Sequence, residues 1–269
     1  MEVFIRMCIL ILTPILALVV GSFLNVAIYR IPLDMSLSTP RSHCPKCNEP
    51  IKWYDNIPVI SYLILRGKCR HCHEPISFRY PLVELLNCLA WVICMMMFTD
   101  VVFVEFKMQW LRFIFSCIAS SALICIFFTD LDHMEIPEVF QLIVLICGLV
   151  ILMEDISKEN VINKVVGFLA CGGIFYIVNL IYKLIKKKDG IGFGDVELVA
   201  VAGLLIGGYN MLFGLLLSCT IGLLIMLIVM KIRKGKEFPF AVILVPGIFV
   251  AMFVGDFVTN WYLALLGVH

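Results

Sequence analysis

MCILILTPILALVVGSFLNVAIY, the stretch Met7–Tyr29, contains no charged side chain over 23 consecutive positions. As a helix rising 1.5 Å per residue it would be about 34 Å long, enough to cross the roughly 30 Å hydrocarbon core of a bilayer. No small-residue cleavage site follows a short apolar core, so we interpret the stretch as a membrane anchor and not as a removable signal peptide. It predicts that the fold begins with a transmembrane helix.

The composition of the whole chain agrees with this start. Of 269 residues, 62% are hydrophobic and 15% are charged, and the mean hydropathy is +1.02. Soluble globular proteins have about 45–50% apolar and about 25% charged residues, so this excess indicates an integral membrane protein. The net charge is +1, and no basic face is interleaved with aromatic residues. We therefore expect no binding of nucleic acid.

Further uncharged runs predict the remaining spans. The longest, Leu198–Met230, would form a helix of about 50 Å, too long for one crossing. The turn-forming residues Gly207–Asn210 divide it into two. The predicted fold class is an all-α polytopic membrane protein with about eight transmembrane helices. The other predicted spans are Leu85–Thr99, Phe113–Thr129, Val139–Met153, Val165–Tyr182 and a last one from Phe238 to Gly255.

The basic residues predict the orientation of these spans. One side of the membrane receives residues 30–80, 130–138, 183–197 and 231–237, which together carry 16 of the 21 lysines and arginines. The positive-inside rule places that side in the cytosol, with both termini outside. The loop of residues 30–80 then becomes a small cytosolic domain between the first and second helices.

This loop contains two CxxC pairs, Cys44-Pro-Lys-Cys47 and Cys69-Arg-His-Cys72. Four thiolates at this spacing are typical of a tetrahedral structural zinc site, and structural disulfides rarely persist in the cytosol. A pair of redox dithiols is the alternative, although the βαβ context of thioredoxin-like motifs is missing. Three nearby histidines could also act as ligands: His43, His71 and His73. The other eight cysteines lie in or beside apolar runs and are interpreted as buried small hydrophobes.

Two aspartates are predicted to meet at the cytosolic interface. Asp130 follows the third span and Asp195 precedes the sixth, in the sequence Gly192-Phe-Gly194-Asp195. Ionisable groups at membrane depth are costly and are functional candidates by default. Two close carboxylates hold a shared proton, so one can activate water while the other protonates a carbonyl oxygen. The alternative is that each aspartate only caps or marks a helix end.

Together these features resemble the bacterial type IV prepilin peptidase family, membrane aspartic proteases of the GxGD kind. The resemblance extends over about residues 15–235. Its most specific part is the N-terminal block: Gly21-Ser-Phe-Leu-Asn25-Val26, Tyr29-Arg30-Ile-Pro32, Asp55-Asn-Ile-Pro58, Leu65-Arg-Gly-Lys-Cys69 and Ile76-Ser-Phe-Arg-Tyr-Pro-Leu-Val-Glu84.

The resemblance also implies roles for individual residues. Asp130, seven residues before Pro137, matches the first catalytic aspartate of the family, with Asp132 as the alternative, and Asp195 matches the second. Cys44, Cys47, Cys69 and Cys72 match the cysteine tetrad of members with a large cytosolic domain. The chain departs mildly at two positions, where Glu138 replaces an expected Asp or Asn and Glu197 replaces a common Lys.

The implied activity is bifunctional. Members of the family cut the basic leader from type IV prepilins and pseudopilins at the cytosolic face, after a glycine. They then N-methylate the new N-terminal residue with S-adenosylmethionine. The resemblance implies a multi-pass protein of the bacterial cytoplasmic (inner) membrane, with the lipid bilayer and prepilins as its partners. Its parts would be residues 1–29, the first transmembrane helix; 30–81, the zinc-binding, methyltransferase-associated domain; and 82–269, the peptidase domain.

The site of the methyl donor has no recognisable motif, because the chain lacks a glycine-rich Rossmann fingerprint. By analogy alone, Asn25, Arg30 and Glu84 beside the cytosolic loop are candidates for binding S-adenosylmethionine. Acidic residues near the two aspartates are candidates for binding a basic leader: Glu135, Glu138 and Glu197.

Three other functions remain open at this point. The chain could be a peptidase without methyltransferase activity, a proton-coupled membrane transporter, or a zinc-dependent membrane scaffold. A transporter predicts acids buried in the middle of spans and broken-helix repeats, whereas both aspartates lie at span ends.

Overall fold

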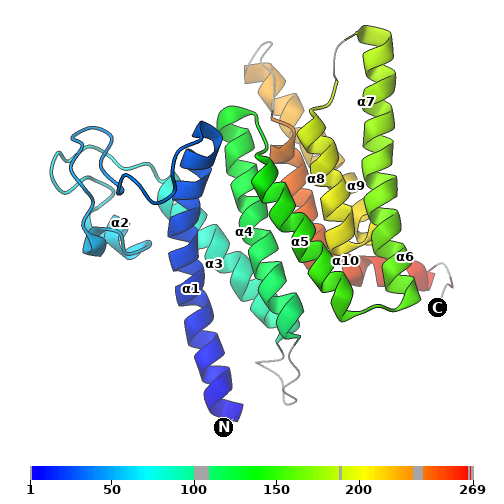
Figure 1. The fold of residues 1–269 in the computed structure, drawn as a ribbon, viewed down its shortest axis with the longest axis horizontal. Coiled ribbons are helices and arrows are strands. Elements are labelled where there is room, and N and C mark those ends of the chain that lie inside the picture. The colour runs from blue at the N-terminus through cyan, green and yellow to red at the C-terminus, as the bar shows by residue number, and fades with distance from the viewer. Residues whose placement is uncertain (1, 100–108, 188–189, 233–238, 266, 268–269) are drawn as a thin grey trace. The chain divides into compact units, whose positions relative to one another are not determined.

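A computed structural model describes residues 2–99, 109–187, 190–232, 239–265 and 267 (Figure 1). Every regular element within these ranges is helical. The α-helices are α1 Glu2–Arg30, α2 Ile60–Ile64, α3 Arg79–Phe98, α4 Trp110–His133, α5 Glu138–Glu154, α6 Lys158–Val166, α7 Gly172–Lys186, α8 Phe193–Ile206, α9 Gly208–Ile232 and α10 Ala241–Leu265. Short elements of other helical types are η1 Ile31–Leu33, η2 Trp53–Asp55 and the π-helix η3 Gly167–Cys171.

The all-helical fold class is confirmed, and the eight predicted spans each coincide with helical structure. The π-helix η3 joins α6 and α7 into one segment, Lys158–Lys186. Five helical segments of the described chain are long and apolar enough to cross a membrane, whereas α5 and α8 have only 17 and 14 residues. The predicted turn at Gly207 is present, with φ +87°. The predicted start of the last span, Phe238, lies outside the described residues.

The chain divides into two compact units, residues 1–113 and 114–269. In the first unit, α1 packs against α3. Gly21 permits a close approach, because a Cβ at this position would lie 2.7 Å from Cα of Glu84. Four residues earlier on α1, the carbonyl oxygen of Ala17 accepts a 2.7 Å hydrogen bond from the fully buried Asn87 side chain. Small residues and interhelical hydrogen bonds are the usual means of holding membrane helices together.

The second unit is built around α8, which packs against α5, η3, α7, α9 and α10. Nine of its 14 residues are buried. This burial is expected of a central helix, whose residues are apolar on nearly all sides. Two residues of α6 form hydrogen bonds at the C-terminal end of α8. Lys164 Nζ donates to the carbonyl oxygen of Leu205 at 3.1 Å, and Asn163 Oδ1 accepts from the backbone N–H of Tyr209 at 3.2 Å.

Glycine is required where η3 crosses the end of α8. A Cβ on Gly203 would lie 2.5 Å from the carbonyl oxygen of Gly167, and a Cβ on Gly167 would lie 2.6 Å from that of Gly203. Because the opposing atoms belong to the backbone, no change of rotamer could relieve the overlap. The two helices therefore fix each other's position through mutual contact of their main chains.

We predict that Gly203→Ala lowers the stability of the protein by about 1–3 kcal/mol, because the added methyl group overpacks this contact. The matched control is Gly173→Ala in α7, where a Cβ would meet nothing within 4 Å. There the same substitution stabilises the helix by about 0.5–1 kcal/mol. Thermal unfolding in detergent measures both, and equal melting temperatures for the two variants would contradict the packing.

Candidate active site and metal site

The two predicted aspartates line the same cavity in the second unit. Asp130 lies near the end of α4 and Asp195 in the first turn of α8, and their exposed fractions are 4% and 9%. The cavity has a volume of about 310 Å³ and is open at the surface. Its other lining residues come from the α4–α5 connection and the start of α8: Met134, Glu135, Ile136, Gly192 and Gly194. Two carboxylates that are 65 residues apart in sequence thus face one space.

A third helix end contributes to the position of Asp130. Its Oδ2 accepts a 3.2 Å hydrogen bond from the backbone N–H of Val242, in the first turn of α10. The N-terminal turn of a helix carries backbone N–H groups without intrahelical partners, and these groups favour a negative charge nearby. The start of α10 therefore stabilises an ionised Asp130.

The glycines before Asp195 are explained by the same geometry. Gly192 occupies the N-cap position of α8, and its carbonyl oxygen accepts from the backbone N–H of Asp195 at 3.1 Å. A Cβ on Gly192 would lie 2.9 Å from Oδ2 of Asp195, and a Cβ on Gly194 would lie 3.3 Å from Cβ of Ile136. Side chains at either position would displace the carboxylate or the α4–α5 connection.

Gln141 of α5 also holds this turn, and the sequence analysis missed it. Its side chain is 5% exposed, and its Nε2 donates a 2.7 Å hydrogen bond to the carbonyl oxygen of Gly194. The available signal was a single amide in the otherwise apolar run Val139–Met153. Asp195 Oδ1, by contrast, is buried and has no hydrogen-bond partner among the described residues.

Of the other acidic residues that the sequence suggests for this site, only one lines the cavity. Asp132, the alternative for the first aspartate, is exposed and does not line the cavity. Of the three glutamates expected near a basic leader, Glu135 lines the cavity, whereas Glu138 and Glu197 do not.

The four cysteines of the long loop come together in the first unit. The Sγ atoms of Cys44, Cys47, Cys69 and Cys72 all lie within 4.8 Å of one another, which makes the group a possible metal site. The Cys44 and Cys72 sulfurs are 3.8 Å apart. None of the three neighbouring histidines belongs to the cluster.

Both halves of the cluster have the same local structure. The backbone N–H of Cys44 donates to the carbonyl oxygen of Glu49, and that of Cys69 donates to the equivalent Glu74, at 3.0 and 2.9 Å. The sequences repeat as well, Cys44-x-x-Cys-Asn-Glu-Pro-Ile51 against Cys69-x-x-Cys-His-Glu-Pro-Ile76. This internal repeat was available in the sequence and was overlooked.

Backbone amides favour the thiolate form of two of these sulfurs, one in each knuckle. The N–H groups of Cys47 and Lys46 lower the pKa of Cys44 to about 7, and those of Cys72 and His71 lower the pKa of Cys69. The pKa of Cys72 is instead raised to about 12, because burial and the neighbouring thiols outweigh the N–H of Glu74. A metal ion would displace the remaining protons, since only thiolates are ligands.

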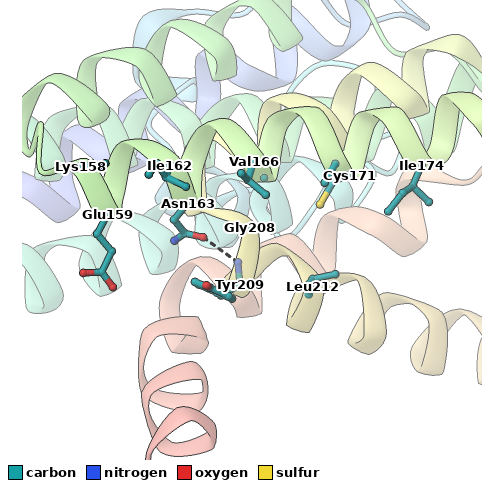
Figure 2. A pocket seen from close by; sticks show the side chains of 12 residues that line it. Lys158, Glu159, Ile162, Asn163, Val166, Cys171, Ile174, Gly208, Tyr209 and Leu212 are labelled. Carbon is teal, nitrogen blue, oxygen red and sulfur yellow. Dashed lines mark hydrogen bonds between the residues drawn. The ribbon is translucent and has the colours of Figure 1, made fainter. Parts of the chain in front are cut away.

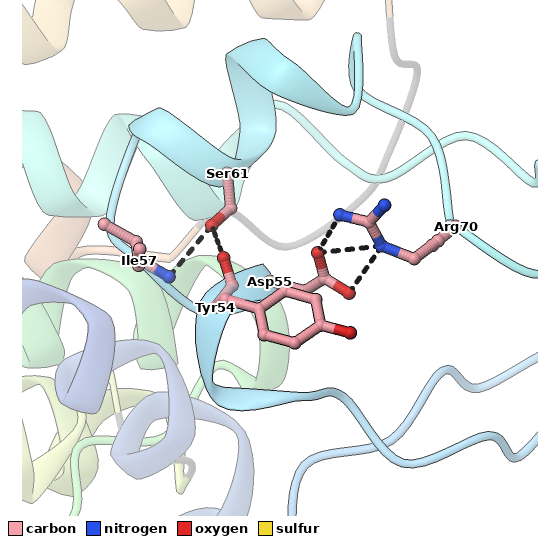
Figure 3. Close-up of polar contacts among 5 residues, drawn as sticks. All are labelled: Tyr54, Asp55, Ile57, Ser61 and Arg70. Atoms are coloured by element: carbon pink, nitrogen blue, oxygen red, sulfur yellow. Dashed lines mark hydrogen bonds and ion pairs between the residues drawn. The ribbon is translucent and has the colours of Figure 1, made fainter.

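An ion pair ties the second knuckle to the rest of the loop (Figure 3). Arg70 Nε lies 3.0 and 2.8 Å from the two carboxylate oxygens of Asp55, and the guanidinium carbon lies 5.5 Å from the centre of the Tyr54 ring. Ser61 Oγ donates to the carbonyl oxygen of Tyr54 at 3.0 Å and accepts from the backbone N–H of Ile57 at 2.9 Å. The hydrogen bonds from Arg70 hold the pKa of Asp55 below its usual range.

The three residues suggested for the methyl donor anchor the loop on its helices. Arg30 donates to the carbonyl oxygens of Ser36 and Pro40 at 2.8 and 2.6 Å. Asn25 Nδ2 donates to the carbonyl oxygen of Tyr80 at 3.1 Å, and Glu84 Oε2 accepts from the backbone N–H of Val59 at 2.7 Å. All three side chains are at most 9% exposed. Their role in binding S-adenosylmethionine stays a prediction.

Comparison with known proteins covers both units. The Bacterial Peptidase A24 N-terminal domain matches residues 15–98, and the Type IV leader peptidase family matches residues 117–227. No solved structure matches the chain.

Several curated relatives are named prepilin leader peptidase/N-methyltransferase. The proteins from Aeromonas hydrophila and Neisseria gonorrhoeae are each 32% identical, over 92% and 94% of this chain and 91% and 94% of their own lengths. The relative from Myxococcus xanthus is 34% identical over 84% of this chain, but the match spans only 64% of that protein.

We predict that Arg70→Ala loosens the segment from Trp53 to Ser61, which hydrogen exchange at neutral pH would detect as faster exchange. Arg41→Ala, at an exposed arginine of the same loop, is the control and leaves exchange unchanged. The folded-state pKa of Asp55 is depressed, so the ion pair stabilises the loop above the usual aspartate pKa of about 3.9. The contribution of the ion pair to loop stability disappears as the pH falls through the lowered pKa of Asp55. Below that pH, the exchange rates of wild type and Arg70→Ala should converge. Persistent equality at neutral pH would show that the ion pair contributes nothing.

Proposed function

Because this chain belongs to the type IV leader peptidase family, we propose that it cleaves the leader from type IV prepilins or pseudopilins and N-methylates the new N-terminus. The observation that carries the peptidase half is the cavity shared by Asp130 and Asp195. S-adenosylmethionine is the methyl donor that the second activity requires. The protein would act as a multi-pass enzyme of the bacterial cytoplasmic membrane. The predicted spans would turn 16 of its 21 basic residues to the cytosol, together with the aspartates.

The proposed hydrolysis uses the two carboxylates in different protonation states. Asp130, stabilised by the start of α10, takes a proton from water as the water oxygen attacks the scissile carbonyl carbon. Asp195, whose Oδ1 is buried without a partner, gives its proton to the carbonyl oxygen. When the C–N bond of the tetrahedral intermediate breaks, the leaving nitrogen takes the proton now held by Asp130, and one hydroxyl of the intermediate returns its proton to Asp195 as the new carboxyl group forms.

The location of the cavity suits a prepilin-like substrate. Such a substrate has a basic leader followed by a long apolar helix, so its scissile bond lies where the membrane meets the cytosol. The cavity lies at the end of α4 and the start of α8 and has Glu135 on its wall, which can attract the basic leader. It is open at the surface, so water can reach the aspartates.

Zinc fits the cysteine cluster as a structural metal. A regular tetrahedron with Zn–S distances of about 2.3 Å has sulfurs about 3.8 Å apart. The 3.8 Å separation between the Cys44 and Cys72 sulfurs matches this value. A bound zinc would close four thiolate positions and leave none for substrate, so its role is to hold the two knuckles together. We assign residues 30–81 to this domain, between the first transmembrane helix, 1–29, and the peptidase part, 82–269.

The methyl transfer needs little from the protein beyond placing its reactants. The new N-terminal amine would give up a proton to solvent, and S-adenosylmethionine, when bound, would supply the methyl group that this amine accepts. We associate this activity with the loop and its anchors Asn25, Arg30 and Glu84. Mass spectrometry of the cleaved product separates this function from a peptidase alone, since methylation adds about 14 Da.

We predict that Asp130→Asn and Asp195→Asn each slow prepilin cleavage by roughly 10²–10⁴-fold, because each removes one acid–base group. Methylation of a pilin peptide that has already been cleaved should stay at the wild-type rate. Asp132→Asn is the matched control, because Asp132 is an exposed acid two residues from Asp130. Cleavage at the wild-type rate in either dyad variant would remove the assignment.

Zinc analysis tests the metal site. We expect one zinc per chain in the wild type and almost none in Cys44→Ser or Cys69→Ser, measured by inductively coupled plasma mass spectrometry. Cys219→Ser, an exposed cysteine of α9 outside the cluster, should keep its zinc. Methyl transfer should fall with the zinc content, whereas the aspartate cavity, in the other unit, should still support cleavage. Wild-type zinc in both cluster variants would refute the site.

A further inference from the structure

A second cavity of the second unit is a groove at the opposite end of α8 from Asp195. It lies between the segment from Lys158 to Ile174, which passes through α6, η3 and the start of α7, and the first turns of α9 (Figure 2). Gly208, which lines it, directly follows Gly207 at the C-terminal end of α8, whereas Asp195 lies at the N-terminal end. The groove is open at the surface and has a volume of about 520 Å³, within the roughly 300–1,000 Å³ of ligand sites.

The groove is long and narrow. Its lining follows one helical segment from Lys158 to Ile174, a distance of about 24 Å at 1.5 Å per residue. A helix with its side chains is about 10–12 Å wide and rises 5.4 Å per turn, so every turn occupies roughly 400–600 Å³. The whole groove therefore has the volume of about one helical turn, spread over more than four. A groove of this length and volume has room for a single hydrocarbon chain.

The polarity of the lining changes along the groove. Lys158 and Glu159 stand at one end, beside the hydrogen-bonded pair formed by Asn163 and the backbone of Tyr209 (Figure 2). Beyond that pair, the walls are apolar side chains on both helices: Val166, Cys171, Ile174 and Leu212. One leaflet with its headgroups is about 20–22 Å thick, half of a 40–45 Å bilayer. The groove thus has the length and the polarity gradient of one leaflet.

We propose that this groove binds one acyl chain of a phospholipid whose headgroup carries both a phosphate and an amine, as in phosphatidylethanolamine. The two charged residues at the polar end supply the headgroup site. The Lys158 ammonium pairs with the phosphate, and the adjacent Glu159 carboxylate pairs with the amine and disfavours a headgroup of net negative charge. The bound chain covers the junction of η3, α8 and α9, where main chains are in contact.

Lipid titration of the intact protein tests the proposal. Full-length protein is purified in a mild detergent, depleted of lipid, and titrated with dioleoylphosphatidylethanolamine or, separately, dioleoylphosphatidylglycerol. Native mass spectrometry counts the lipids bound per chain. We expect one site that retains the ethanolamine lipid at least about tenfold more tightly, equivalent to 1.4 kcal/mol. Equal retention of both lipids would overturn the headgroup assignment.

Groove-filling substitutions locate the site, each beside a matched control. Ala170→Trp and Leu212→Trp place a bulky ring in the groove, whereas Leu169→Trp and Leu216→Trp place the same ring on neighbouring exposed positions outside it. The first pair should lose the tight lipid and the second pair should keep it. Retention by the groove-filling variants, or equal loss in all four, would overturn the location. Because Ala170 is exposed, its variant has room for the ring and still tests the site if Leu212→Trp does not fold.

Two further experiments test which headgroup is preferred and whether the groove binds a lipid or a peptide. Glu159→Gln should abolish the preference for the ethanolamine lipid without loss of binding, since the chain still enters the groove. An apolar peptide of prepilin-like sequence should leave the bound lipid in place. Displacement of the lipid by that peptide, lost again in Ala170→Trp, would show that the groove takes a protein segment and would refute the lipid proposal.

Discussion

The central helix α8 is too short to cross a bilayer. Its 14 residues rise about 21 Å, against a hydrocarbon core of about 30 Å, so at least one of its polar ends lies within the depth of the membrane. Backbone groups at such an end cannot be left to lipid, because an unpaired polar group in hydrocarbon costs several kcal/mol. The rest of the second unit is arranged around satisfying both ends of this helix.

The polar groups at the two ends of α8 are paired in different ways. The C-terminal end has a structural role, whereas the N-terminal end carries one of the two candidate catalytic aspartates. At the C-terminal end, the buried Lys164 donates to the carbonyl oxygen of Leu205 and compensates the negative end of the helix dipole. At the N-terminal end, Gln141 holds Gly194 and Gly192 accepts from the first turn, yet Asp195 Oδ1 remains without a partner. The end of α8 with an unsatisfied polar atom is thus the end at which Asp195 and Asp130 line an open cavity.

The sequence predicts those features that are built from residue types that are rare in this chain. In a chain with 15% charged residues, Asp130 and Asp195 stand out against apolar runs, and the four loop cysteines stand out by their spacing. The turn at Gly207 is predictable because one helix of 33 residues would be too long. What the sequence does not reveal are contacts between distant residues that have no pattern of their own. The hydrogen bond of Gln141 joins residues 53 positions apart, and that of Lys164 joins residues 41 apart.

The predicted spans are shorter than the observed helices, because charged residues can lie inside a helix. A search for uncharged windows ends a helix at the first charged residue, but α6 begins at Lys158 and includes Lys164, whose charge is turned inward to a carbonyl oxygen. The short π-helix at Gly167–Cys171 is also invisible to periodicity, although the glycine contacts there place α8.

The repeated knuckles have a consequence for how the loop between α1 and α3 folds. Each knuckle supplies two of the four sulfurs, and Lys46 of one faces Glu74 of the other at 3.9 Å, so neither half has a complete site alone. If the proposed zinc binds there, the loop would gain or lose its structure as a whole, with no stable half-folded form. Loss of the ion would then release both knuckles together, while α1 and α3 would stay packed through Gly21 and Asn87.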